Sequence, residues 1–207
     1  MTTMPDALIR QFDVSRESRV RLECYVALLL EWQARINLIG PSTVEAVWQR
    51  HVADGLQLVA LLPRGTRVIA DLGSGGGIPG LILAAATEAH VHLYESNGKK
   101  VAFLREALRR MGAKGTVHQR RIEDLAQAEG LPQATVVTAR ALAHLPLLLG
   151  YAAPFLTGGA LGLFHKGQDV DAELTEATKS WKIKTRKHPS CTDSQAVILE
   201  VEEACHV

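Results

Sequence analysis

Apolar and polar positions divide the chain into two parts with different periods. In the first part, an apolar stripe at helical spacing ends where Gly40 and Pro41 interrupt it. The stripe consists of Val20, Cys24, Leu28 and Trp32. Ser42, with Glu45 three residues later, has the sequence of a capping box and predicts that a second helix starts there. We therefore predict an N-terminal helical extension over residues 1–64.

From Thr66 onward, short β-branched or apolar runs alternate with helical stretches, which is the pattern of β-α units around a parallel sheet. The runs that we assign to strands are RVIAD, VHLYE, GTVHQ, ATVVTA and ALGLFHK. Helices are predicted after Pro79, after Asn97, over 122–127, over 142–155 and over 170–181. Residues 65–207 are therefore predicted to form a Rossmann-like core, in one domain with the extension.

The end of the chain carries two strand-like runs, KIKTRKH and AVILEVEE, separated only by the turn-rich segment PSCTDS. Because the connection is too short for a helix, the two strands should pair antiparallel. The sequence thus predicts an α/β protein with a mostly parallel seven-stranded sheet whose last strand is antiparallel. This order of elements resembles the class I S-adenosylmethionine-dependent methyltransferase fold more than a dinucleotide-binding domain.

Composition and charge limit the class of protein. The 207 residues are 47% hydrophobic and 22% charged, and no apolar run approaches the length of a membrane span. The net charge of +1 gives no global indication of nucleic-acid binding. Cys24, Cys191 and Cys205 are far apart and in no C-x-x-C pair, which favours a reducing compartment and no zinc site. We expect a cytoplasmic monomer that holds no metal and does not associate with membranes.

The stretch IADLGSGGGIPG contains five glycines and is open to two interpretations. Gly75, Gly77 and Gly80 match the G-x-G-x-x-G spacing of a dinucleotide loop. Starting from Asp71, the same stretch reads D-x-G-x-G-x-G, with Gly73 as its first glycine, as in S-adenosylmethionine enzymes. A carboxylate beside a pyrophosphate is unfavourable, whereas it suits an ammonium and a sulfonium. Together with the C-terminal hairpin, Asp71 favours S-adenosylmethionine as the cofactor.

Charged residues follow the strands at the edge where ligands bind in parallel sheets. Glu95 ends the second strand, where an acid accepts ribose hydroxyls in both cofactor classes. The cations are Arg120 and Arg121 after the third strand, Arg140 after the fourth and Lys166 after the fifth. Such a cluster of cations predicts a polyanionic acceptor.

The acceptor chemistry is indicated by motifs that are missing. The fourth strand is followed by TARAL rather than the N/D-P-P-Y run of exocyclic-amine methylation, and no cysteine stands in the usual P-C or T-C dipeptide for covalent catalysis. What remains includes acceptors that are already nucleophilic, such as guanine N7, for which catalysis reduces largely to alignment. Arg140 would then contact guanine O6 or a phosphate, because N7 itself must stay free.

Four segments carry a family resemblance: RHVADG at 50–55, DLGSGGGIPG at 71–80, TARAL at 138–142 and HKG at 165–167. In this order they resemble the glucose-inhibited division protein B family, also called RsmG. Ile39 and Gly55 depart from the family pattern, which often has Thr and Ser there. The resemblance implies a methyltransferase that uses S-adenosylmethionine to modify a guanine N7 in 16S ribosomal RNA or in the small ribosomal subunit.

The resemblance, with the residues above, gives a set of candidate site residues. The cofactor would contact Asp71, Gly73, Ser74, Gly75, Gly77, Glu95, Ile122, Glu123 and Arg140. The RNA would contact Arg50, Arg120, Arg121, Arg140 and Lys166. Arg140, Lys166 and His51 are the candidate catalytic residues, and Asn37, Arg50, His51 and Asp54 form the N-terminal signature of the family. A local contact between His51 and Asp54 on one helix face is an alternative, structural role.

Three other functions are compatible with parts of the pattern. A small-molecule methyltransferase could use the strand-end cations to bind an anionic metabolite. An NAD-dependent oxidoreductase would use the glycine loop for a pyrophosphate. A cofactor-sensing module would bind S-adenosylmethionine without turning it over.

Overall fold

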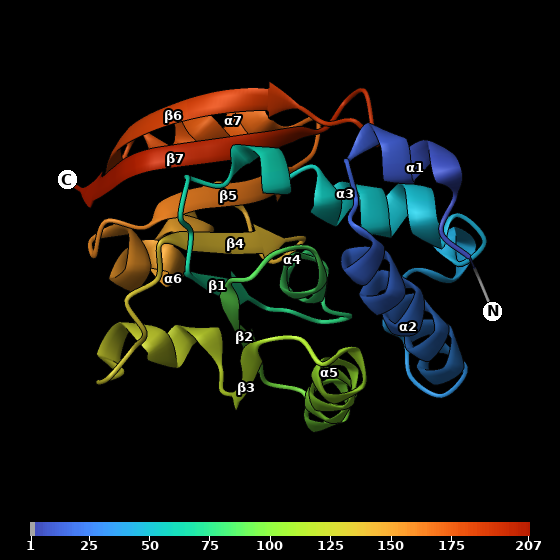
Figure 1. The fold of residues 1–207 in the computed structure, drawn as a ribbon. Helices are drawn as coiled ribbons and strands as arrows, with labels where there is room; N and C mark the ends of the chain where they lie inside the picture. Colours follow the sequence, from blue (N-terminus) through green and yellow to red (C-terminus); the bar gives the residue numbers. More distant parts are fainter. Residues whose placement is uncertain (1–2) are drawn as a thin grey trace.

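A seven-stranded sheet forms the middle layer of the structure, a computed structural model that describes residues 3–207 (Figure 1). The strands are β1 (Val68–Leu72), β2 (His90–Glu95), β3 (Gly115–Gln119), β4 (Val136–Arg140), β5 (Leu161–Lys166), β6 (Trp181–Pro189) and β7 (Val197–His206). They lie in the order β3-β2-β1-β4-β5-β7-β6. Strands β1 to β5 are parallel, and β7 runs antiparallel to both of its neighbours. The predicted fold class is therefore confirmed.

Helices cover both faces of the sheet, because alternate strand residues point to opposite sides. Ile69 and Leu93 join a core with α4 (Gly80–Ala86) and α5 (Gly98–Met111). Ala70 and Tyr94, their neighbours in sequence, join a second core. The elements of that second core are α6 (Leu145–Leu156), α7 (Val170–Ala177) and the 3₁₀ helix η4 (Ile122–Gln127). Both faces are thus buried, which explains why the central strands read as nearly continuous apolar runs.

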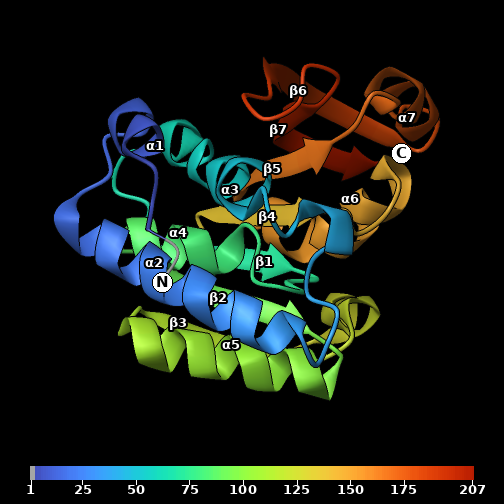
Figure 2. The ribbon, with the colours of Figure 1, turned by 90° about the vertical axis from the view of Figure 1, so that its right-hand side faces the viewer.

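The N-terminal part contributes α1 (Asp6–Gln11) and α2 (Arg16–Gln33), and α2 packs against α4 and α5 (Figure 2). The predicted helix is confirmed, but its buried face is not the predicted stripe. Val20 is 61% exposed, Cys24 and Trp32 are only partly buried, and Leu28 is the one residue of the predicted stripe among the fully buried positions of α2. These positions are Leu22, Tyr25, Val26, Leu28 and Leu29. The buried face of α2 is the one that packs against α4 and α5, because α2 covers these helices rather than the sheet itself.

The second helix does not form as the sequence predicts. It is replaced by the short elements η1 (Pro41–Thr43), the π-helical turn η2 (Trp48–Val52), α3 (Ala53–Leu56) and η3 (Val59–Leu61). Ser42 is exposed and caps no helix. Instead, the Thr43 hydroxyl donates to the Gly40 carbonyl oxygen at 2.7 Å and closes a 3₁₀ turn that the capping-box pattern did not anticipate.

Two predicted boundaries also shift. Helix α7 ends at Ala177 because Trp181 pairs with His206 and starts β6. Helix α6 starts three residues later than predicted, since residues 141–144 form a loop in which Ala141 has φ of +51°. Within residues 3–207, no helix combines the length and apolarity needed to cross a membrane. The assignment of extension and core to one domain stays a prediction.

The N-terminal part holds the glycine loop that follows β1. The Tyr25 hydroxyl, buried in α2, donates to the Gly76 carbonyl oxygen at 2.7 Å. A Cβ at Gly76 would lie 2.9 Å from the Leu38 carbonyl oxygen, so only glycine lets the two backbones approach this closely. The Gln33 amide in turn binds the backbone of Leu38 and Ile39. The glycine loop is therefore held in place by Tyr25 and Leu38, which lie far from it in the sequence.

We predict that Tyr25→Phe lowers the free energy of unfolding by about 1–2 kcal/mol, because the buried Gly76 carbonyl loses its partner. Chemical denaturation measures this change. Tyr151→Phe is the control, since no hydrogen bond of the Tyr151 hydroxyl is found within residues 3–207. Equal effects of the two substitutions would contradict the assigned role of Tyr25.

Candidate active site

The loop between β1 and α4 is shaped by glycines in the left-handed backbone region. Gly73, Gly75 and Gly77 have φ of +66°, +53° and +83°. A Cβ at Gly77 would lie 2.4 Å from the side chain of Leu81. At Gly75 the nearest atom to such a Cβ is a backbone oxygen 3.7 Å away, so this glycine leaves open space above the loop. The loop is thus bare where a ligand can approach it.

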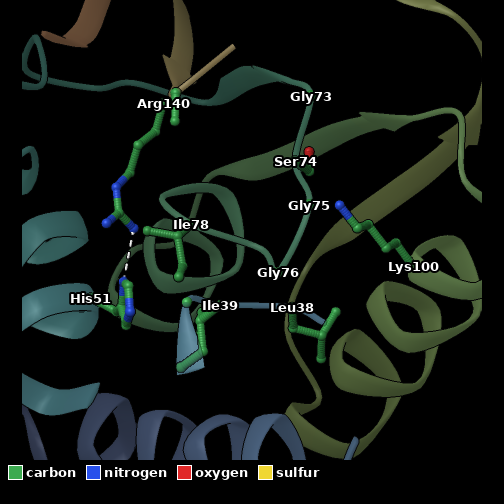
Figure 3. A pocket seen from close by; sticks show the side chains of 12 residues that line it. Leu38, Ile39, His51, Gly73, Ser74, Gly75, Gly76, Ile78, Lys100 and Arg140 are labelled. Atoms are coloured by element: carbon green, nitrogen blue, oxygen red, sulfur yellow. Dashed lines mark hydrogen bonds between the residues drawn. The ribbon is translucent and has the colours of Figure 1, made fainter. Parts of the chain in front are cut away.

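Two cavities flank this loop. The first has a volume of about 290 Å³ and lies between the loop, the N-terminal part and β4 (Figure 3). Its walls include Leu38, Ile39, His51, Ser74, Ile78 and Arg140. The second, of about 310 Å³, is lined by Tyr94, Glu95, Arg120, Arg121, Ile122, Glu123 and Leu142. Gly73, Gly75, Lys100 and Ala141 line both cavities, which are therefore neighbouring halves of one site.

The second cavity brings together most of the residues predicted to hold the cofactor. Glu95 is 9% exposed, and its two carboxylate oxygens accept hydrogen bonds from the Gly75 amide at 2.9 Å and the Asn97 amide at 2.8 Å. Ile122 and Glu123 begin η4 and line the same cavity. An acid tied to the glycine loop therefore lies in one cavity with the start of η4.

Asp71 lies beneath the loop and lines neither cavity. Its side chain is fully buried and accepts a hydrogen bond from the Thr138 hydroxyl at 2.7 Å. Burial raises the pKa of this carboxyl to about 6. A Cβ at Gly80 would come within 2.5 Å of the carboxylate, so that glycine makes room for it. In this position Asp71 supports the loop, and its contact with a cationic ligand stays a prediction.

Arg140 joins the core to the N-terminal part. Its Nε donates to Asp54 Oδ2 at 2.9 Å. Its Nη1 donates to His51 Nδ1 at 3.0 Å (Figure 3). Arg140 therefore lies between His51 and Asp54, and the predicted local contact of these two residues does not form. Burial, with a smaller effect of Arg140, lowers the pKa of His51 to about 4, so the imidazole is neutral at pH 7. Since Nδ1 accepts, the proton is on Nε2, which lies 2.7 Å from Thr43 Oγ1.

The connection between β6 and β7 docks beside Arg140 and was missed by sequence reasoning. Asp54 Oδ1 accepts from Thr192 Oγ1 at 2.9 Å and from Gln57 at 2.7 Å. Arg50, 47% exposed, donates to the Thr192 carbonyl oxygen at 3.2 Å. A third cavity of about 210 Å³ opens among Arg50, Arg140, Lys166 and Thr192. The contacts of Thr192 with Asp54 and Arg50 join residues more than 130 positions apart, so no local pattern predicts them.

Lys166 is not the free cation that its place at a strand end predicts. Its side chain is 7% exposed, pairs with Glu173 of α7 and donates to the Ala143 carbonyl oxygen at 3.1 Å. Glu173 also accepts from the Leu145 amide at 2.6 Å. Lys166 and Glu173 therefore hold the loop after β4. Arg120 and Arg121, in contrast, are exposed at the second cavity.

The sheet order, the glycine loop after β1 and the acid after β2 define a class I methyltransferase fold. Two solved structures agree with this class. An rRNA methylase from Streptococcus thermophilus has a TM-score of 0.52 at 12% identity, with 71% of this chain and 92% of that chain covered. A Streptococcus mutans protein crystallised in complex with SAH has a TM-score of 0.51 at 9% identity, with 73% and 94% covered.

Residues 19–200 match the GidB family model, described as rRNA small subunit methyltransferase G. The ribosomal RNA small subunit methyltransferase G of Rhodopseudomonas palustris (strain HaA2) is 52% identical over 199 residues, which cover 94% of this chain and 83% of the relative. That of Rhodospirillum centenum is 52% identical over 192 residues, covering 93% and 87%. The chain belongs to the GidB family, which confirms the resemblance drawn from its motifs.

We predict that Glu173→Gln lowers the free energy of unfolding by about 3 kcal/mol, because it leaves the buried Lys166 ammonium without a counter-charge. Denaturation with urea measures this loss. Glu176→Gln on the same helix is the matched control, since Glu176 pairs with Lys179 at the surface and should matter little. A Glu173 variant as stable as the control would show that Lys166 does not depend on this pair.

Proposed function

We propose that this protein transfers a methyl group from S-adenosylmethionine to a guanine N7 in 16S ribosomal RNA of the small ribosomal subunit. The observation that carries the proposal is one bare glycine loop shared by two cavities, with an acid in one and a half-buried arginine in the other. Relatives that are about half identical to this chain are named ribosomal RNA small subunit methyltransferase G. Because ribosomal RNA is the substrate, the enzyme would act in the cytoplasm.

The residues that line the two cavities suit S-adenosylmethionine. In the second cavity, Glu95 would accept hydrogen bonds from the ribose, and Ile122 and Glu123 would border the adenine. In the first cavity, Gly75 leaves room for the methionine part against the bare backbone. The cofactor, when bound, supplies a methyl group on a cationic sulfonium. The protein supplies the cradle, and Asp71 acts through the loop above it.

The residues of the first cavity favour an acceptor that needs no base. Both nitrogens of His51 are engaged, and with its pKa lowered to about 4 the neutral imidazole is a weak base at neutral pH. Among residues 3–207, no cysteine lines the three cavities. Guanine N7 carries its own lone pair, so alignment with the methyl group is what the site has to provide. Arg140, held rigidly by Asp54, would position the guanine through O6 or an adjacent phosphate.

The RNA would meet the exposed cations at the mouth of the site. Arg120 and Arg121 border the second cavity, and Arg50 borders the third. Lys166 would contribute only through the loop it holds, because Glu173 already compensates its charge. The near-neutral net charge of +1 favours recognition of an assembled subunit over bare RNA. That the enzyme is a monomer stays a prediction.

Labelled S-adenosylmethionine, incubated with 16S RNA or small subunits from cells that lack this gene, tests the proposal. We expect labelled 7-methylguanosine after digestion to nucleosides. Replacing Arg120 and Arg121 with Gln should lower kcat/KM at least tenfold while cofactor affinity is unchanged. It should also reduce the slope of log binding constant against log salt by about 1.5.

Arg67→Gln is the control for these two positions, since Arg67 is exposed before β1, at the opposite edge of the sheet. It should leave methyl transfer unchanged. Cofactor binding without label in either RNA substrate would contradict the proposal and favour methylation of an anionic metabolite. A labelled nucleoside other than 7-methylguanosine would overturn the assigned acceptor atom.

A further inference from the structure

Lys100 differs from Arg140 and Lys166 because its charge has no partner among the described residues, and from the exposed Arg120 and Arg121 because it is half-buried. Its side chain is half-buried and lines both cavities beside the glycine loop (Figure 3). Arg140 pairs with Asp54, and Lys166 pairs with Glu173. For the Lys100 ammonium, the described residues 3–207 provide no carboxylate within 4.0 Å. A half-buried ammonium between two cavities is therefore available to an anionic group of a ligand.

The position of Lys100 in its helix is unfavourable for stability. It lies in the first turn of α5, which Asn97 caps and which contains no acidic residue. The positive end of the helix dipole repels a cation there, so neither local helix stability nor an ion pair accounts for a lysine at this site. Lys99, its neighbour in the same turn, is exposed and lines neither cavity.

The other charged groups cannot replace Lys100 for an anion in the first cavity. Asp54 already compensates Arg140, and His51 is neutral. Figure 3 shows Arg140 and His51 on one side of the first cavity and Lys100 on the other, directed toward Gly75. We therefore expect the acceptor to lie on the Arg140 side of the first cavity and the cofactor on the Lys100 side.

We propose that Lys100 binds the carboxylate of the methionine part of S-adenosylmethionine. This inference rests on the proposed function, because it takes the cofactor from there. Among the groups of that cofactor, the carboxylate is the only anion, and the glycine loop where the methionine part would lie is the wall that Lys100 shares. An RNA phosphate is the less suitable occupant, because Arg120 and Arg121 offer exposed cations at the mouth while Lys100 lies deeper.

Calorimetric titration with three ligands tests the assignment without turnover. S-adenosylhomocysteine has the carboxylate, decarboxylated S-adenosylmethionine lacks it but keeps an ammonium, and 5′-methylthioadenosine lacks both groups. In Lys100→Met, we expect the Kd of S-adenosylhomocysteine to rise at least tenfold, while the Kd values of the other two ligands change less than twofold. Lys100→Arg should restore most of the affinity, and Lys99→Met, the matched control, should leave all three values unchanged.

Other outcomes would overturn the assignment. An equal loss for all three ligands would place Lys100 at the adenosine rather than at the carboxylate. Unchanged S-adenosylhomocysteine affinity with weakened, less salt-dependent RNA binding would make Lys100 a phosphate contact. If the unsubstituted protein bound none of the ligands, the proposed function itself would fail, and the assignment of Lys100 with it.

Discussion

The hydrogen bond from the Tyr25 hydroxyl to the Gly76 carbonyl oxygen connects two parts of the chain that the sequence pattern separates. Through it, the N-terminal helices hold the loop that borders both cavities. The close approach of Leu38 to Gly76 and the Gln33 bonds to Leu38 and Ile39 extend this support into the wall of the first cavity. The N-terminal part is therefore a component of the site, although the parallel sheet and its loops could be described without it.

Charge compensation divides the polar residues of the site into fixed and available groups. Arg140 is half-buried beside Asp54 and Lys166 is buried beside Glu173, so both charges are compensated within the protein. Among the described residues, Lys100 is left available at the cavities, as are Arg120 and Arg121 at the mouth, whereas Arg50 pairs with Asp193 at 3.6 Å. His51 is neutral and bonded through both nitrogens. Such a site is suited to positioning reactants, which agrees with the proposed acceptor that is already nucleophilic.

The sequence predicts the parts of the fold that depend on local pattern, and misses those that depend on distant partners. The strand runs, the glycine loop and the C-terminal hairpin follow from periodicity and turn residues, as does the convergence of Glu95 and Ile122 at one sheet edge. The buried face of α2, with Val20 exposed, depends on the helices packed against it. Lys166 was read as a free cation because its partner Glu173 lies on another element.

Hydrogen–deuterium exchange with and without saturating S-adenosylhomocysteine tests most directly whether the N-terminal part and the glycine loop form one cofactor site. We expect slower exchange in two separate segments: residues 38–40 of the first cavity wall, and residues 73–78 of the loop. Binding verified by calorimetry, with protection in residues 73–78 and none in residues 38–40, would show that the N-terminal part supports the loop without belonging to the site. Protection in neither segment would contradict the account as a whole.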